Sequence, residues 1–237
     1  MLTKTRRLGL LVPSSNTIME HEFNIMRPKE ATVHVARVRL KTVTISELMG
    51  METEIEAAAL RLADAKVDVI GFGCTSGSLF RGLGHDQEIV RRIEKTTDTP
   101  AVATAGAVVN ALKTLKVSRI SVATPYTGEI NSLEKRFLEE NGFVIQRIKG
   151  LGIKDNLEIG EQTARTVYNL VKEADTSWND CVFVSCTNLK TIGVINRLEE
   201  ELEKPIISSN IATFWAMLRK IKYVAPIMGW GRLLTML

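Results

Sequence analysis

The chain has little of what disulfide-rich and zinc-binding proteins need. Its 237 residues include only three cysteines and three histidines, and no two cysteines form a Cys-x-x-Cys pair. An odd, unpaired set of cysteines argues against a disulfide framework, and so few histidines argue against a zinc site. We therefore expect a protein with neither a disulfide framework nor a bound metal.

Long apolar runs and a strong charge of one sign are also missing. No stretch approaches the ~18 consecutive apolar residues of a membrane span. The first apolar run, Leu8 to Val12, ends at Pro13 and is shorter than the ~7–15 residues of a secretory signal. The net charge is only +4, with basic residues scattered among acidic ones. We expect a cytoplasmic protein that binds neither membrane nor nucleic acid.

What the chain does have is an ordinary globular composition, 45% hydrophobic and 24% charged, with alternating strand and helix patterns. Helical periodicity predicts helices over residues 129–140, 158–174 and 189–204. Short runs rich in Val and Ile predict buried strands over residues 8–12, 32–38, 67–72, 101–104, 119–123, 143–148, 181–185 and 205–209. This alternation predicts an α/β fold with parallel sheets.

Two kinds of loop occur twice at one spacing. Pro13 and Pro125 each follow a predicted strand and are 112 residues apart. Cys74 and Cys186, each followed by threonine, also end predicted strands and are also 112 residues apart. A looser correspondence relates the segments at Pro100 and Pro205, here at an offset of 105. The repeat predicts two similar α/β lobes related by a pseudo-twofold axis.

The duplicated loops predict where a ligand binds. Parallel sheets bind ligands beyond the carboxyl ends of their strands, so four loops should surround one cleft, with the thiols of Cys74 and Cys186 on opposite sides. We expect both thiols to lie at helix starts, where free N–H groups lower the pKa of a thiol from ~8.5 toward neutrality. The four loops span residues 13–16, 74–76, 125–127 and 186–188.

The polar side chains of these loops indicate the charge of the substrate. They are hydrogen-bond donors without formal charge, and no Lys or Arg lies within the four segments. Such donors suit a carboxylate, and duplicated loops supply two clusters of them, so a small dicarboxylate is the expected substrate. The candidate binding residues are Ser14, Asn16, Thr75, Ser76, Tyr126, Thr187 and Asn188.

The same segments carry a family resemblance across nearly the whole chain. The sequence resembles the maleate cis–trans isomerases of the aspartate/glutamate racemase superfamily in residues 12–20 (VPSSNTIME), 73–78 (GCTSGS), 124–126 (TPY), 185–188 (SCTN) and 229–234 (GWGRLL). The resemblance implies a homodimer whose last helix returns to the first lobe. The lobes would then comprise residues 1–104 plus 211–237, and residues 105–210.

The resemblance also implies a reaction, the cofactor-independent conversion of maleate to fumarate. Cys74 would be the nucleophile that adds to an olefinic carbon and forms a succinyl thioether, and rotation about the former double bond would follow. Cys186 would handle the proton at the adjacent carbon. A thiolate is a competent nucleophile for such an addition, and a thiol can donate a proton from the opposite side. Asn16, Tyr126 and Asn156 match substrate-binding residues of the family.

Other interpretations of these residues remain open. Paired cysteines also serve amino-acid or hydantoin racemases, as opposing bases on a carbon acid. A malonate-type decarboxylase shares much of the pattern but resembles a form with glycine at the position of Cys74. A non-catalytic sensor of small dicarboxylates would use the same cleft. Asn16 and Asn156 could also cap helices, and Cys181, within a strand, is expected to be a small core residue.

Overall fold

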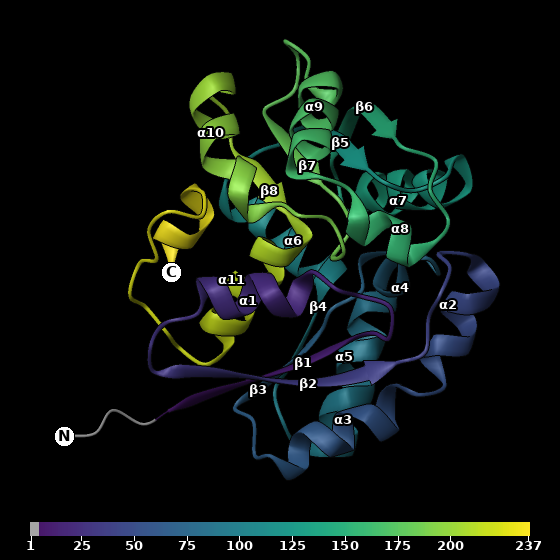
Figure 1. Ribbon diagram of the computed structural model, residues 1–237, viewed down its shortest axis with the longest axis vertical. Coiled ribbons are helices and arrows are strands. Elements are labelled where there is room, and N and C mark those ends of the chain that lie inside the picture. Colours follow the sequence, from purple (N-terminus) through teal and green to yellow (C-terminus); the bar gives the residue numbers. More distant parts are fainter. Residues whose placement is uncertain (1–4) are drawn as a thin grey trace.

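The fold consists of two four-stranded sheets in two lobes, one drawn in purple and blue and the other in teal and green (Figure 1). A computed structural model describes residues 5–237; residues 1–4, at the start of the predicted first lobe, lie outside the described residues. All pairings between named strands are parallel. The strands are β1 (Arg6–Pro13), β2 (Ala31–Val38), β3 (Val69–Phe72), β4 (Ala101–Ala103), β5 (Arg119–Thr124), β6 (Val144–Gly150), β7 (Cys181–Val184) and β8 (Ile206–Ser208).

The two sheets repeat one topology. The first has the order β2-β1-β3-β4 and the second the order β6-β5-β7-β8, so each strand of one sheet has its counterpart four strands later. The shared topology agrees with the 112-residue repeat, and the expected fold of two similar α/β lobes is confirmed. The four duplicated loops follow the carboxyl ends of β1, β3, β5 and β7. Because the strands of each sheet are parallel, the two loops of each lobe lie at the same edge of its sheet.

Helices flank both sheets. The helix α11 packs against α6 and against β3 and β4 of the first sheet, and it also contacts β8 of the second. The helices are α1 (Met19–Met26), α2 (Ile45–Glu52), α3 (Ile55–Asp64), α4 (Thr75–Leu79), α5 (His85–Thr97), α6 (Thr104–Thr114), α7 (Gly128–Glu140), α8 (Asn156–Glu161), α9 (Ala164–Ala174), α10 (Ile192–Leu202) and α11 (Ser209–Lys220), followed by the 3-10 turn η1 (Arg232–Met236).

Two predicted helices differ from those observed. The helix expected over 158–174 is two helices, because Thr163 begins a new one: its hydroxyl accepts a hydrogen bond from the N–H of Thr166 at 3.1 Å, which caps α9. The helix expected over 189–204 begins later, at Ile192, and ends at Leu202. Its end coincides with a left-handed residue, Glu203, at φ +55°. In the described part of the chain, no helix is both long and apolar enough to cross a membrane.

Candidate active site

Cys74 lies between β3 and α4. Its side chain caps α4, because the sulfur accepts the N–H of Gly77 at 3.3 Å, and the hydroxyl of Ser76 lies 3.8 Å from the same atom. Only 3% of the residue is exposed. The structure thus places Cys74 at the start of a helix, as the strand-end position predicted.

Cys186 follows β7 but does not begin a helix. The chain makes a turn there, and α10 starts only at Ile192, so the expectation of a helix start at this thiol is wrong. The sulfur accepts the N–H of Asn188 at 3.3 Å and a hydrogen bond from the hydroxyl of Tyr126. The backbone of Cys186 has φ +99°, a region that a non-glycine residue adopts only at an energetic cost. Held strain of this kind is typical of functional positions.

The two cysteine loops are bonded directly to each other. Thr187, the residue after Cys186, donates its hydroxyl to the carbonyl of Gly73 at 3.0 Å. The hydroxyl of Ser209 accepts from Thr75 at 2.8 Å and from the Cys186 N–H at 3.1 Å. All of these groups are buried. The equivalent ends of the two sheets therefore meet in one polar cluster.

The first loop joins the same cluster through Asn16. Its side-chain oxygen accepts the N–H groups of Ile18 at 3.0 Å and Met19 at 2.9 Å, while its amide nitrogen donates to Thr187 at 3.0 Å. Next to it, the N–H of Thr17 donates to the side chain of Asn188 at 2.8 Å. Asn16 therefore caps the start of the α1 segment and connects the lobes at the same time.

Asn156 and the serines of the first loop complete the arrangement. Asn156, at the start of α8, donates to the hydroxyl of Ser15 at 2.8 Å, and its carbonyl accepts from Asn188 at 2.5 Å. The Ser14 hydroxyl instead bonds the backbone of Leu40, donating to its carbonyl at 3.3 Å and accepting its N–H at 3.2 Å. Asn156 thus lies within the interlobe cluster, whereas the hydroxyl of Ser14 is already held by the β2–α2 connection.

Burial controls the acidity of the thiols. It raises the pKa of Cys74 to about 11, with the N–H of Gly77 and the hydroxyl of Ser76 lowering it only in part. Burial likewise raises the pKa of Cys186 to about 12, partly opposed by the bond from Tyr126. The expected lowered pKa values are wrong, because the loss of water outweighs the donors.

Three polar groups of this region escaped the sequence analysis. Ser209 follows β8, and nothing in its own motif distinguishes it. Arg37 of β2 brings a cation to the first loop, donating to the carbonyl of Asn16 at 2.7 Å, although the loop itself contains none. Glu134 of α7 is fully buried and accepts the hydroxyl of Ser185 at 2.5 Å. The 112-residue offset could have revealed it, because Glu22 lies that far before it.

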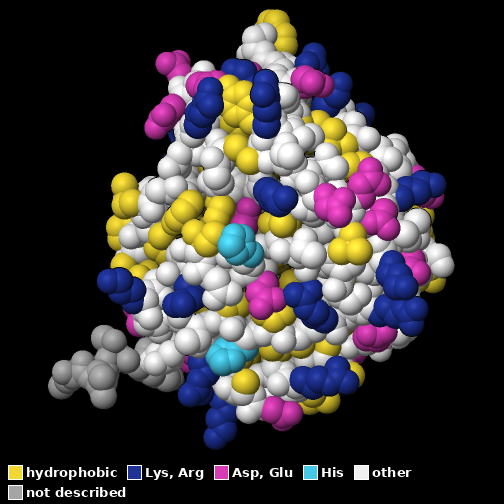
Figure 2. All heavy atoms as spheres, viewed as in Figure 1, with side chains coloured by type: hydrophobic (Ala, Val, Ile, Leu, Met, Phe, Trp, Pro, Cys, Tyr) yellow, Lys and Arg dark blue, Asp and Glu magenta, His cyan; other side chains and the backbone are white. Residues whose placement is uncertain are grey.

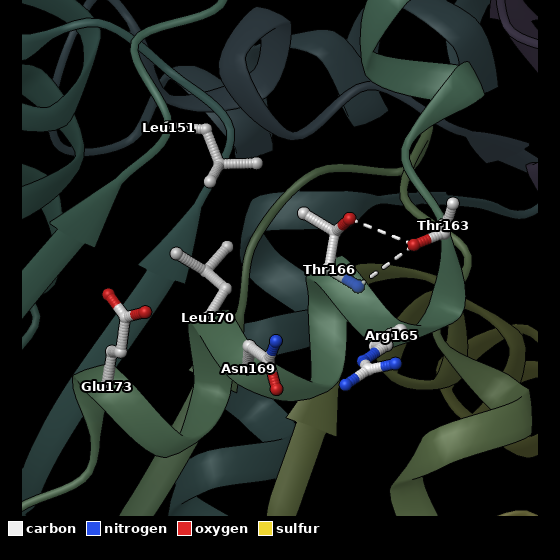
Figure 3. Close-up of a pocket in the computed structure, with 7 residues that line it drawn as sticks. All are labelled: Leu151, Thr163, Arg165, Thr166, Asn169, Leu170 and Glu173. Atoms are coloured by element: carbon white, nitrogen blue, oxygen red, sulfur yellow. Dashed lines mark hydrogen bonds between the residues drawn. The ribbon is translucent and has the colours of Figure 1, made fainter.

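Other surface features lie apart from this cluster. Figure 2 shows one face of the molecule with Lys and Arg interspersed among Asp and Glu rather than gathered in a field of one sign. Figure 3 shows a hollow beside α9, lined in part by Arg165 and Glu173, in which Thr163 and Thr166 make the capping bond described above. Neither cysteine loop contributes to that hollow.

Comparisons with known proteins agree with the fold and the repeat. Residues 8–234 match a family model described as arylmalonate decarboxylase. A maleate isomerase of Pseudomonas putida (strain KT2440) is 33% identical, over 99% of both chains. A maleate isomerase of Pseudomonas putida S16, solved as a cysteine-to-alanine variant with maleate, is 29% identical with a TM-score of 0.94, covering 97% of each chain.

A third similar protein is informative about chemistry. The maleate cis–trans isomerase of Nocardia farcinica, solved as a cysteine-to-serine variant, holds a covalently bound succinylcysteine intermediate. It is 28% identical, covering 97% of this chain and 98% of that one, with a TM-score of 0.94. The fold and these matches define an enzyme family of two-lobed α/β proteins. The chain belongs to this family, the arylmalonate decarboxylase family. Four of its similar relatives are maleate isomerases, and the resemblance inferred from the motifs is confirmed.

Proposed function

We propose that the protein is an isomerase that converts maleate to fumarate without a cofactor. The observation that carries the proposal is the hydrogen bonding of the two cysteine loops to each other, which holds two buried thiols beside one cluster of uncharged donors. Membership of a family with several maleate isomerases supports the same reaction. The succinylcysteine found in the Nocardia farcinica protein supports a covalent route.

The reaction begins at Cys74. Its thiolate adds to one olefinic carbon of maleate, forming a carbon–sulfur bond, while the thiol of Cys186 gives its proton to the adjacent carbon. The carbon–carbon bond is now single and rotates. The Cys186 thiolate then takes back a proton from that carbon, the double bond reforms in the trans geometry, and the bond to Cys74 breaks to release fumarate. Both thiol groups return to their starting states.

The surroundings of the thiols support this division of roles. The sulfur of Cys74 caps α4 and accepts the N–H of Gly77 at 3.3 Å, a donor that favours the thiolate. Burial, together with the charge of Glu134, raises the pKa of Cys186 and keeps that thiol protonated. Tyr126, which donates to Cys186, has a pKa raised well above its ordinary value by burial and stays protonated.

The uncharged donors of the cluster hold the two carboxylates of the substrate. They lie on both lobes, so each carboxylate has donors of its own, and none of the four loops contributes a Lys or Arg that would compete with the developing charge. We assign substrate binding to Ser14, Asn16, Thr75, Ser76, Tyr126, Asn156, Thr187 and Asn188.

Proton NMR of purified protein with maleate tests the proposal. We expect fumarate to form with no added metal or cofactor. In deuterated water, α-deuteration of aspartate, glutamate or a hydantoin without production of fumarate would identify a racemase instead. Release of carbon dioxide from an arylmalonate would identify a decarboxylase, which the cysteine at position 74 disfavours. Binding of maleate without turnover would identify a sensor.

The proposal also covers the lobe boundaries, the cellular location and the assembly of the protein. We assign residues 1–104 plus 211–237 to one lobe and 105–210 to the other, supported by the packing of α11 on β3 and β4. A cytoplasmic location would keep both thiols reduced, as the chemistry requires. A homodimer is the assembly that the family resemblance implies. Light scattering tests the dimer.

A further inference from the structure

Two buried glutamates occupy equivalent positions in the two lobes. Glu22 of α1 and Glu134 of α7 are 112 residues apart, the offset that relates Cys74 to Cys186. Their helices follow the equivalent strands β1 and β5. Glu22 is 3% exposed and Glu134 is fully buried. A buried carboxylate is costly unless it is hydrogen-bonded, so the partners of each show what it is for.

Glu22 is completely satisfied. One of its oxygens accepts the N–H groups of Thr191 at 2.5 Å and Ile192 at 3.1 Å, and the other accepts the Thr191 hydroxyl at 3.0 Å and the Asn210 amide at 2.7 Å. These donors belong to the start of α10 and to α11, in a place where neither cysteine takes part. Glu22 therefore has a structural role, connecting α1 to α10 and α11.

Glu134 has one donor only. Ser185 bonds one oxygen at 2.5 Å, and the other oxygen has no hydrogen-bond partner among the described residues. Ser185 is the residue directly before Cys186, and the charge of Glu134 acts on both Tyr126 and Cys186. Glu134 therefore differs from Glu22, because one of its two oxygens lacks a hydrogen bond and its donor is next to Cys186. Packing alone does not account for this difference.

Among residues 5–237, no Lys or Arg bonds the side chain of Glu134. The helix α4, which packs against α7, has no titratable side chain beyond its capping residue, Cys74. On β6, Arg147 and Lys149 bond Glu173 of α9 instead. The charged residues of α7 itself are exposed, namely Glu129, Lys135, Arg136, Glu139 and Glu140. Among the described residues, the groups of the site on which its charge acts are Tyr126 and Cys186.

We propose that Glu134 is a positioning residue of the isomerase, which acts through Ser185, Tyr126 and Cys186 to set when the Cys186 thiol releases its proton. The inference rests on the proposed function for its role in turnover. When Glu134 is ionised, its charge disfavours a second negative charge on Cys186 and keeps that residue as the proton donor. When Glu134 is protonated, this effect disappears. Burial raises the pKa of Glu134 to about 7, so the change falls within the working range of pH.

Alkylation of Cys186 by iodoacetamide, followed by peptide mass spectrometry, tests the coupling without any substrate. Glu134→Gln removes the charge, so above pH 7 the Cys186 thiol becomes more acidic and reacts faster than in the wild type, by roughly tenfold for each unit by which its pKa falls. Well below pH 7 the two proteins should react equally, because Glu134 is neutral in both. Equal rates at every pH would overturn the inference.

The pH profile of kcat/KM for maleate gives a second readout. The wild type should show an inflection near pH 7 that Glu134→Gln lacks. Ser185→Ala removes the donor that lowers the pKa of Glu134, so it should move the inflection to higher pH. Glu22→Gln is the matched control, expected to lower the unfolding temperature and to keep the inflection. An inflection that persists in Glu134→Gln contradicts the proposal.

These readouts separate the two proposals. If the protein does not isomerise maleate, the alkylation rates still report whether Glu134 controls Cys186. If it does isomerise maleate and neither readout responds to Glu134→Gln or Ser185→Ala, only the role of Glu134 fails. Should Glu134→Gln not fold, the shift expected of Ser185→Ala decides the question by itself.

Discussion

Thr187 donates its hydroxyl to the carbonyl of Gly73 at 3.0 Å, across the interface between the lobes. Each residue is the neighbour of a candidate catalytic cysteine, so this bond fixes the two thiol-bearing loops relative to each other. The same hydroxyl accepts the amide of Asn16, which ties the first loop to the pair. Any change that breaks this contact should therefore affect stability and catalysis together.

Replacing Thr187 by valine keeps its shape and removes its hydroxyl. The buried Gly73 carbonyl and the Asn16 amide each lose a partner, and we expect the free energy of unfolding to fall by ~1–3 kcal/mol. Turnover of maleate should fall as well, since the loops lose their common anchor. Thr235→Val, at an exposed position, is the control and should change stability by less than ~0.5 kcal/mol. Denaturant titration and initial rates measure both effects, and wild-type values for Thr187→Val would argue against the anchor.

Gly77 leaves room for the sulfur of Cys74. A Cβ at this position would lie 2.9 Å from that sulfur and would collide with the side chain of Met51. We expect Gly77→Ala to lower the free energy of unfolding by ~1–3 kcal/mol through overpacking. It should also suppress turnover, because the new Cβ displaces the sulfur of Cys74 from its position at the start of α4. In Gly193→Ala the new Cβ meets no atom within 4 Å, and the substitution should stabilise α10 by up to ~1 kcal/mol.

Glu134 should give stability a distinctive dependence on pH. Its pKa rises from 4.5 to about 7 on burial, so between these values the folded chain binds a proton that the unfolded chain has lost. Stability contributed by this group is therefore lost as the pH rises from about 4.5 to 7 and then stays constant. We expect Glu134→Gln to gain in unfolding temperature relative to the wild type over that range. A constant difference between the two proteins, measured calorimetrically at several pH values, would show that the carboxyl titrates normally.

Cys74→Ser should abolish turnover. A serine hydroxyl is a far weaker nucleophile than a thiolate, and among the groups that bond this position none is a base: the neighbours are the N–H of Gly77 and the hydroxyl of Ser76. The variant should keep its fold, because an oxygen can accept the same N–H. Fumarate formation followed by NMR, together with the circular dichroism of both proteins, distinguishes a lost nucleophile from a lost fold. Substantial activity would remove the covalent mechanism.

The repeat made much of this arrangement predictable from the sequence. Equal spacing between Pro13 and Pro125 and between Cys74 and Cys186 was enough to place four loops at the same ends of two sheets. The acidity of the thiols was not predictable in this way, because it depends on how completely the folded lobes exclude water. Ser209 was missed for a similar reason: it reaches both cysteine loops only through the packing of α11 between the sheets.

The helix start predicted at Cys186 is absent, which shows that the sequence pattern around a residue does not by itself determine where a helix begins. Cys74 and Cys186 share their position after a strand and a following threonine, yet only Cys74 caps a helix. The turn at Cys186 contains a left-handed backbone and donates to Ser209, a contact with a residue 23 positions away. Tertiary hydrogen bonds of this kind override the local tendency to begin a helix, and a repeat in sequence does not reveal them.

Mass spectrometry of Cys186→Ser incubated with maleate tests the central claim most directly. In this variant the proton that completes the adduct comes from the serine hydroxyl or from water. With no thiolate to take that proton back, elimination is slow and the adduct on Cys74 should accumulate. We predict a mass increase equal to one maleic acid, located by peptide mapping on Cys74 and absent from Cys74→Ser. Fumarate production by Cys186→Ser at the wild-type rate, or an adduct on Cys181 instead of Cys74, would contradict the account.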